Sequence, residues 1–228
     1  MFLGHFAVGM AAKRVAPRVS LGTLFVAAQF LDLLWPTLLL LGIERVRIVP
    51  GITTMTPLDF EHYPVSHSLL AAVGWGLLVG LVYYAWRRRA GDASVLGLAV
   101  VSHWLLDVVV HRPDLPLVPG GPMVGLGLWN SVAGTLIVEL SLFAAGAWIY
   151  LHATRPRDAT GRWAMVGLLG FLLAVYLASA FGAPPPDVTA IAWVGEAQWL
   201  IVLWAWWADA HRSVAGLPAT GQAALRGA

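Results

Sequence analysis

Three side chains that can bind a metal ion or carry protons lie at four-residue steps in one apolar segment. They are His103, Asp107 and His111. In an α-helix, residues four apart are separated by roughly 40° around the axis, so the three side chains form one stripe. A carboxylate or imidazole in an apolar helix is costly unless it is paired, neutralised or bound to metal. The stripe therefore predicts either a functional site or a strongly paired polar network.

Two more side chains of this kind interrupt other apolar segments, and they extend the candidate site. Asp32 and His67 are expected to converge with His103 and Asp107. Two imidazoles and two carboxylates suit Zn²⁺, Mn²⁺ or Fe²⁺, with water in an open position. The chain has no cysteine, which argues against a structural zinc knot. The alternative is a hydrogen-bonded network of Asp and His that ties two helices together.

Four further residues are candidates for supporting roles. His5 and His111 are possible ligands of a second ion, although His111 could instead cap the end of its helix. His62 and Glu139 are candidates for moving protons in catalysis. The alternatives are a solvated loop histidine for His62 and a neutral, hydrogen-bonded carboxyl for Glu139.

The composition indicates the environment in which these residues must be held. Of 228 residues, 59% are hydrophobic and only 11% are charged, and 12 are Trp. This is typical of an integral membrane protein. The net charge of +2 is too small to suggest binding to nucleic acid.

The apolar segments predict an all-α, polytopic membrane bundle with six transmembrane helices. Each segment is near the length that spans a bilayer, and they cover residues 20–41, 66–86, 93–111, 126–152, 163–183 and 189–209. Residues 1–12 are too short to cross and predict a re-entrant or amphipathic helix carrying His5. We expect one membrane domain over 1–212, with the metal site in 1–111 and a disordered cytoplasmic tail over 213–228.

The basic residues predict the orientation of the bundle. Eleven of the 14 Lys and Arg lie in connections on one side. By the positive-inside rule both termini are cytoplasmic, in a plasma or inner membrane, and the candidate site lies in the outer half. The outer connections 43–65 and 112–125 are long, and we expect them to be lids or entrance walls above the site.

An ordered series of motifs in the first half of the chain resembles the membrane-bound metal-dependent hydrolases. The series comprises Gly4-His5, Phe30-Leu31-Asp32-Leu33-Leu34-Trp35-Pro36, Pro64-Val65-Ser66-His67-Ser68 and Ser102-His103-x-x-x-Asp107. That family is similar to the zinc-dependent phospholipase C and S1/P1 nuclease group. The resemblance implies that Asp32, His67, His103 and Asp107 bind metal and that His5 reaches an ion shared through Asp107. The family usually has a second carboxylate and a histidine where this chain has Leu34 and Trp35.

These observations lead to one expected function and two alternatives. The expected function is hydrolysis of a phosphoester, on a membrane phospholipid or a lipid-linked phosphate, with a divalent metal that is most plausibly zinc. The first alternative is an ion- or proton-coupled transport protein that uses the same cluster, and the second is a scaffold with a structural metal. Gly76-Leu77-Leu78-Val79-Gly80 permits close helix packing, within the molecule or between copies in a homo-oligomer.

Overall fold

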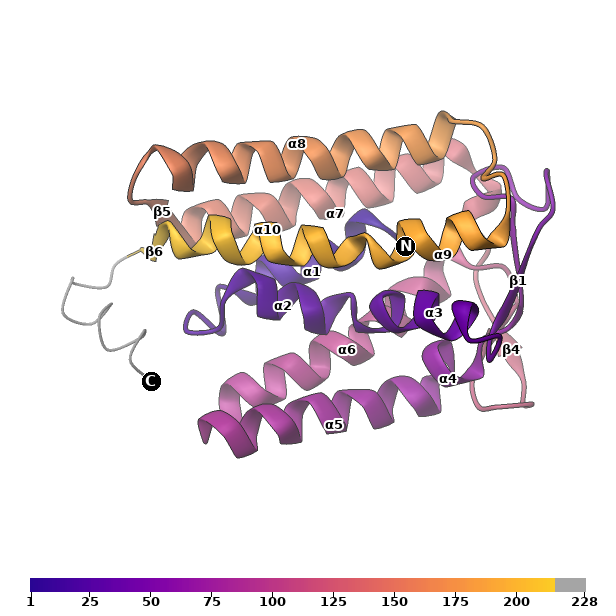
Figure 1. Cartoon of the computed structure of the whole chain (residues 1–228), viewed down its shortest axis with the longest axis horizontal. Helices are drawn as coiled ribbons and strands as arrows, with labels where there is room; N and C mark the ends of the chain where they lie inside the picture. The colour runs from indigo at the N-terminus through magenta and orange to yellow at the C-terminus, as the bar shows by residue number, and fades with distance from the viewer. Residues whose placement is uncertain (216–228) are drawn as a thin grey trace.

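The computed structural model describes residues 1–215 and shows a mostly helical protein (Figure 1). Five helical segments are long and apolar enough to cross a membrane: α5 (Leu69–Arg87), α6 (Ala90–Val110), α7 (Val132–Ala153), α8 (Ala159–Phe181) and the segment Val188–Ala210. The last is divided into α9 (Val188–Glu196) and α10 (Gln198–Ala210). The number and placement of these segments support a polytopic helical protein. The first predicted span needs one correction.

That span is a pair of short helices rather than one straight helix. α2 (Leu21–Ala28) and α3 (Phe30–Leu40) meet at Gln29 with a bend of 60°. The segment was expected to be continuous because most of its residues are apolar, and apolar composition does not report a bend. Helix breaks at membrane depth are tolerated where protein surrounds the freed backbone groups. Counting the pair as one span gives six.

The broken helix and α1 (Leu3–Ala12) lie at the centre of the bundle (Figure 1). α1 packs against α2, α6 and α7, while α2 packs against α6 and α10, and α3 packs against α9. Gly146 of α7 lets the backbones of α1 and α7 approach closely, since a Cβ there would lie 2.6 Å from the Ala7 carbonyl oxygen. α1 is therefore enclosed by protein, which distinguishes it from a helix lying on the membrane surface.

The close glycine packing predicted for the second span is formed within the molecule. A Cβ on Gly76 of α5 would lie 2.7 Å from the Gly97 carbonyl oxygen of α6. The small residues thus bring α5 and α6 together as an antiparallel pair at one side of the bundle (Figure 1).

Short strands occur in the connections, where an all-α fold was expected to have loops. β1 (Arg45–Ile48) pairs antiparallel with β2 (Leu58–His62), with Val46 opposite Phe60. The connection 112–125 contains β3 (Leu115–Pro116) and β4 (Met123–Val124). A four-residue helix, α4 (Pro64–His67), follows β2 and holds His67. The hairpins lie at one end of the bundle (Figure 1).

The third strand pair lies at the opposite end, where the chain leaves α10. β5 (Thr154–Pro156) pairs with β6 (Arg212–Val214). The buried Arg212 guanidinium donates to the Gly161 carbonyl and to the Thr154 hydroxyl. Regular structure therefore continues past residue 212, and residues 216–228 of the predicted tail lie outside the described residues.

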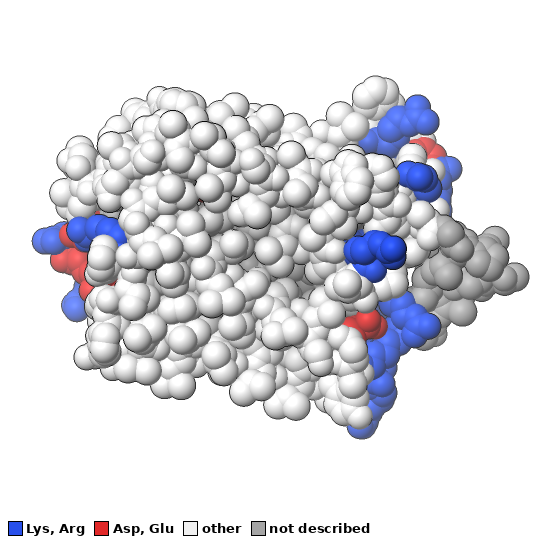
Figure 2. Space-filling view, turned by 180° about the vertical axis from the view of Figure 1, so that it is seen from behind, with Lys and Arg blue, Asp and Glu red and all other residues white. Residues whose placement is uncertain are grey.

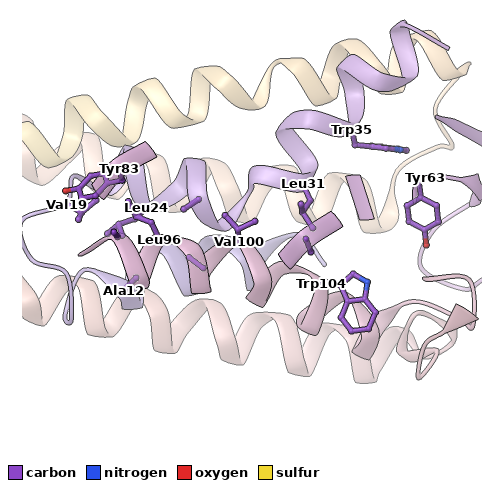
Figure 3. Close-up of a cluster of buried hydrophobic side chains, with 14 of the residues drawn as sticks. Ala12, Val19, Leu24, Leu31, Trp35, Tyr63, Tyr83, Leu96, Val100 and Trp104 are labelled. Atoms are coloured by element: carbon purple, nitrogen blue, oxygen red, sulfur yellow. The ribbon is translucent and has the colours of Figure 1, made fainter. Parts of the chain in front are cut away.

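Two apolar clusters fill the interior on either side of the central helices. One joins α2 and α3 to α6, with Leu24, Leu31 and Val100 fully buried (Figure 3). The other joins α1 to α7, α8 and α10 through residues such as Phe6 and Leu168. Because α1, α2 and α3 lie between these clusters, polar side chains on them are held in fixed positions.

The outer surface matches a protein that sits in a bilayer. Figure 2 shows charged side chains gathered at the two ends of one face, with uncharged surface between them. Large apolar side chains are exposed on the long helices, among them Leu77 of α5, Leu98 of α6 and Leu200 of α10. Exposed apolar surface on this scale is stable in lipid and costly in water. The structure thus supports a multi-pass integral membrane protein.

Candidate metal centre

Five of the predicted ligands meet in two overlapping groups that could hold a metal ion. One group is His5, His103 and Asp107, and the other is Asp32, His67 and His103. Within each group the ligand atoms lie within 4.8 Å of one another. The residues come from α1, α3, α4 and α6, which are far apart in sequence. The groups share His103, so the two form one continuous cluster.

His103 is oriented by the break between α2 and α3. Its Nδ1 lies 2.8 Å from the Ala28 carbonyl oxygen, at the end of α2. A carbonyl only accepts hydrogen bonds, so Nδ1 carries a proton and Nε2 is the ring atom left to bind a metal ion. Nε2 is fully buried and makes no hydrogen bond in the part of the chain that the structure describes. This is the state in which imidazole binds metal.

His67 is oriented by a buried relay that ends at a carboxylate. The Ser66 hydroxyl donates to Glu44 Oε2 at 2.5 Å, and Ser66 Oγ lies 2.7 Å from His67 Nδ1. Because the serine proton is directed to the carboxylate, Oγ accepts from Nδ1–H of His67. Glu44 Oε1 also accepts from the backbone N–H groups of Val65 and Ser66, each at 2.8 Å. The relay leaves the lone pair of His67 on Nε2.

Four acceptor atoms consequently face one another. His67 Nε2 lies 3.4 Å from Asp32 Oδ1 and 3.8 Å from Asp107 Oδ2. His103 Nε2 lies 3.6 Å and 3.3 Å from the same two oxygens. Two imidazole lone pairs beside two carboxylates repel one another in a buried site unless a positive charge lies between them. The donor set of nitrogen and oxygen suits a divalent cation.

Asp107 joins the two groups because its oxygens point in different directions. Oδ2 faces His67 and His103, while Oδ1 lies 3.1 Å from His5 Nε2. The amino group of Met1 also lies 2.5 Å from Oδ1. The His5 ring stacks on that of His103, with centroids 3.5 Å apart and planes 8° apart. His5 therefore reaches the cluster through the carboxylate that the resemblance assigns to a shared ion.

Asp32 is placed by two features of α3. It lies in the first turn, where the helix dipole favours a carboxylate. Pro36 lacks the N–H that would bond the Asp32 carbonyl, and Gln198 Nε2 of α10 donates to that oxygen instead, at 3.4 Å. The Asp32 side chain is 26% exposed, whereas those of His103 and Asp107 are at most 2% exposed. The cluster is open on the Asp32 side.

Three of the predicted residues lie outside both groups: His111, His62 and Glu139. His111 caps the end of α6, where its Nδ1 bonds Asp114 Oδ1 at 3.0 Å and its ring lies beside Trp129. Burial lowers the pKa of the His111 imidazole. His62 is exposed at the end of β2. For these two histidines the placement matches the alternative reading of the sequence, a helix cap and a loop histidine.

Glu139 is buried and holds the start of α1. Its Oε2 accepts from the backbone N–H groups of Phe2 and Leu3, at 2.9 and 2.7 Å. A carboxylate is favoured at a helix N-terminus, where four N–H groups lack intrahelical partners. The contacts fix the helix that carries His5, which favours an anchoring role for Glu139 over proton transfer.

Sequence reasoning missed Glu44 and the aromatic cover of the cluster. Glu44 is only 1% exposed although it lies in a connection outside the apolar segments. Phe60 packs beside Trp35 and Tyr63 beside His67, with ring centroids 5.5 and 5.4 Å apart. Alternating apolar residues around β2 were a signal that this connection folds back on the site. It forms a wall of the site, as expected for the connection 43–65.

Comparisons of this chain with protein-family models, with curated proteins and with solved structures find no match. The residues and geometry of the cluster are thus the grounds on which a function is assigned.

Proposed function

We propose that this protein is a membrane-embedded, metal-dependent hydrolase of phosphoesters carried by membrane lipids. The observation that carries the proposal is the convergence of four candidate ligand atoms: Nε2 of His67 and His103 and one oxygen each of Asp32 and Asp107. The hydrogen bonds of Ala28 and Ser66 fix both imidazoles in the metal-binding tautomer.

Zinc is the metal that this donor set fits best, with manganese or iron as the other candidates. Two imidazoles and two carboxylates, without thiolate, are typical of catalytic rather than structural zinc sites. A divalent ion held by these residues would supply a water of lowered pKa, about 7 for zinc, and a positive charge that polarises a phosphoryl oxygen.

The chain's own residues orient the two imidazole rings and leave one side of the cluster accessible. The Ala28 carbonyl holds the His103 ring, and Glu44 acts through Ser66 on the His67 ring. The exposed side of Asp32 leaves room for water and the phosphoester. Tyr63 packs on the His67 ring and Phe60 packs on Trp35, so aromatic side chains limit the access of water beside His67. The surrounding apolar bilayer and the placement of the site favour a lipid substrate over a soluble one.

The first experiment measures metal content and reaction together. The wild type, His103→Ala and Asp107→Asn are purified in detergent, and His152→Ala is the control because His152 is an exposed histidine of α7 that contacts the Trp148 carbonyl. We expect about one or more zinc, manganese or iron ions per chain in the wild type and control. Both ligand variants should lose them while retaining the elution profile and helical content.

The same four proteins are then incubated with phospholipid vesicles, and the release of water-soluble phosphate compounds is measured. The hydrolytic activity of each ligand variant should fall by more than the roughly 10- to 100-fold loss that is typical when a residue next to a metal ligand is changed. A wild type that neither contains nor takes up metal would refute the proposal. Metal-dependent ion flux into the vesicles without product release would favour the transport alternative.

A further inference from the structure

A second feature beside the metal centre is a cavity of about 640 Å³ between α8 and the broken segment α9–α10. We call it the lateral cavity. It arises because α10 packs along α8, whereas α9 diverges to pack on α3. Phe2, Trp35 and Glu139 line it, together with Met55 and Trp129 from the connections between helices. Its volume is in the range of sites that hold a small molecule.

The lateral cavity opens sideways to the position of the bilayer. Phe171 of α8, Val194 of α9 and Leu200 of α10 line it and are themselves 43%, 71% and 67% exposed. These side chains belong to segments that are long and apolar enough to span a membrane. A hydrocarbon chain can thus enter from the lipid without crossing water.

Polar atoms without partners lie in the wall of this apolar cavity. Tyr176 of α8 is only 4% exposed, and its hydroxyl has no hydrogen-bond partner among residues 1–215. Oε1 of Gln198 is also buried without a partner, on the side chain whose Nε2 donates to the Asp32 carbonyl. Buried hydroxyl and amide groups are normally hydrogen-bonded, so the unpaired Tyr176 O–H indicates a ligand with an acceptor oxygen.

We propose that the lateral cavity binds one acyl chain of a glycerophospholipid and that Tyr176 Oη donates a hydrogen bond to the ester carbonyl of that chain. The apolar walls match the hydrocarbon, and the hydroxyl matches the one strong acceptor that an acyl chain carries at its end. Gln198 joins the cavity to Asp32, the open side of the metal centre. The inference that this lipid is also the substrate rests on the function proposed above. The inference that it binds in the cavity does not.

The test uses full-length protein stripped of metal by a chelator, so that binding is measured without reaction. It is placed in vesicles of phosphatidylethanolamine and phosphatidylglycerol containing a phosphatidylglycerol with a photoactivatable diazirine in one acyl chain. Cross-linked peptides are identified and quantified by mass spectrometry. Three variants of α8 are compared with the wild type: Tyr176→Phe, Ala180→Phe and Ala178→Phe. Ala180 lines the cavity, whereas Ala178 is an exposed residue outside it, so the two Ala→Phe changes are matched.

We expect cross-links to concentrate in residues 171–180 and 194–204. Tyr176→Phe keeps the ring and should lower their yield about fivefold, the effect of one hydrogen bond. Ala180→Phe fills the cavity and should lower the yield about tenfold. Ala178→Phe should leave it unchanged. Unchanged elution profiles of all variants show that the fold is retained.

Even labelling of all bilayer-exposed helices, or equal yields in Tyr176→Phe and the wild type, would overturn the proposal. Preferential labelling by a prenyl phosphate carrying the same diazirine would assign the cavity to an isoprenoid and overturn the acyl assignment. Specific cross-linking in the metal-free protein, combined with no release of phosphate compounds by the metal-loaded protein, would refute the hydrolase and leave this inference intact.

Discussion

At the scale of single residues, the position of two protons decides what the cluster can bind. His103 donates a hydrogen bond from Nδ1–H to the Ala28 carbonyl oxygen. His67 donates one from Nδ1–H to Ser66 Oγ, and the Ser66 hydroxyl donates one to Glu44. Partners of this kind set the tautomer of metal-binding histidines and raise their basicity. Glu44 is therefore a positioning residue, although it is not a ligand.

Glu44→Gln tests this role with almost no change in shape. The amide oxygen can still accept from the Val65 and Ser66 backbone, but the amide nitrogen would then donate to Ser66 Oγ. Ser66 would turn its proton to His67 Nδ1 and move the ring proton to Nε2, where it blocks metal. We expect the affinity for zinc to fall roughly 10- to 100-fold, measured by competition with a chromophoric chelator.

Glu61→Gln is the matched control, because Glu61 is a carboxylate of β2 that pairs with Arg47 at 2.9 Å and belongs to neither ligand group. Its zinc affinity should equal that of the wild type. Equal affinities in all three proteins would show that the relay does not set the tautomer.

At the scale of elements, the site depends on helices that are interrupted or unusually close. The bend at Gln29 frees the Ala28 carbonyl, and Pro36 frees the Asp32 carbonyl for Gln198. α6 carries His103 and Asp107 and is held against α5 by glycine contacts. Changes at these contacts should therefore affect both stability and metal binding.

Two Gly→Ala substitutions on α5 separate packing from helix propensity. A Cβ at Gly76 would meet the α6 backbone at 2.7 Å, whereas one at Gly74 has nothing within 4 Å. We expect Gly76→Ala to destabilise the protein by about 1–3 kcal/mol through overpacking. Gly74→Ala should be neutral or stabilising by up to about 1 kcal/mol, because Ala favours helix over Gly. Thermal unfolding in detergent measures both, and similar unfolding temperatures for the two variants would contradict the close α5–α6 contact.

At the scale of the whole molecule, charge and apolar surface are separated along the bundle. Charged side chains gather at the two ends, and the cluster lies nearer the end that carries β1 and β2 (Figures 1 and 2). We propose that this end faces outward and that both termini are cytoplasmic, from the basic residues of the opposite end.

The absence of cysteine allows a direct test of this orientation. Ala159→Cys and Ala183→Cys place single thiols at exposed positions at the start of α8 and just beyond its end. A membrane-impermeant maleimide applied to intact cells should label only Ala183→Cys, and permeabilised cells should label both. The reverse pattern would place the metal centre on the cytoplasmic side.

The sequence by itself determined the class of protein, five of the six predicted spans, and several residues that the structure brings together in the cluster. Apolar segments of spanning length have few stable folds other than membrane helices, and the four-residue step from His103 to Asp107 holds on any α-helix. Asp32 and His67 could be chosen because polar groups are costly in apolar surroundings.

Only the tertiary structure decided which faces meet and what completes the site. The bend at Gln29, the burial of α1 beside α7 and the folding of β2 over His67 depend on packing between segments distant in sequence. The Glu44 relay and the lateral cavity follow from the same contacts, and neither leaves a periodic pattern in the chain. Spacing along a helix fixes which residues share a face, but contacts between helices decide what that face binds.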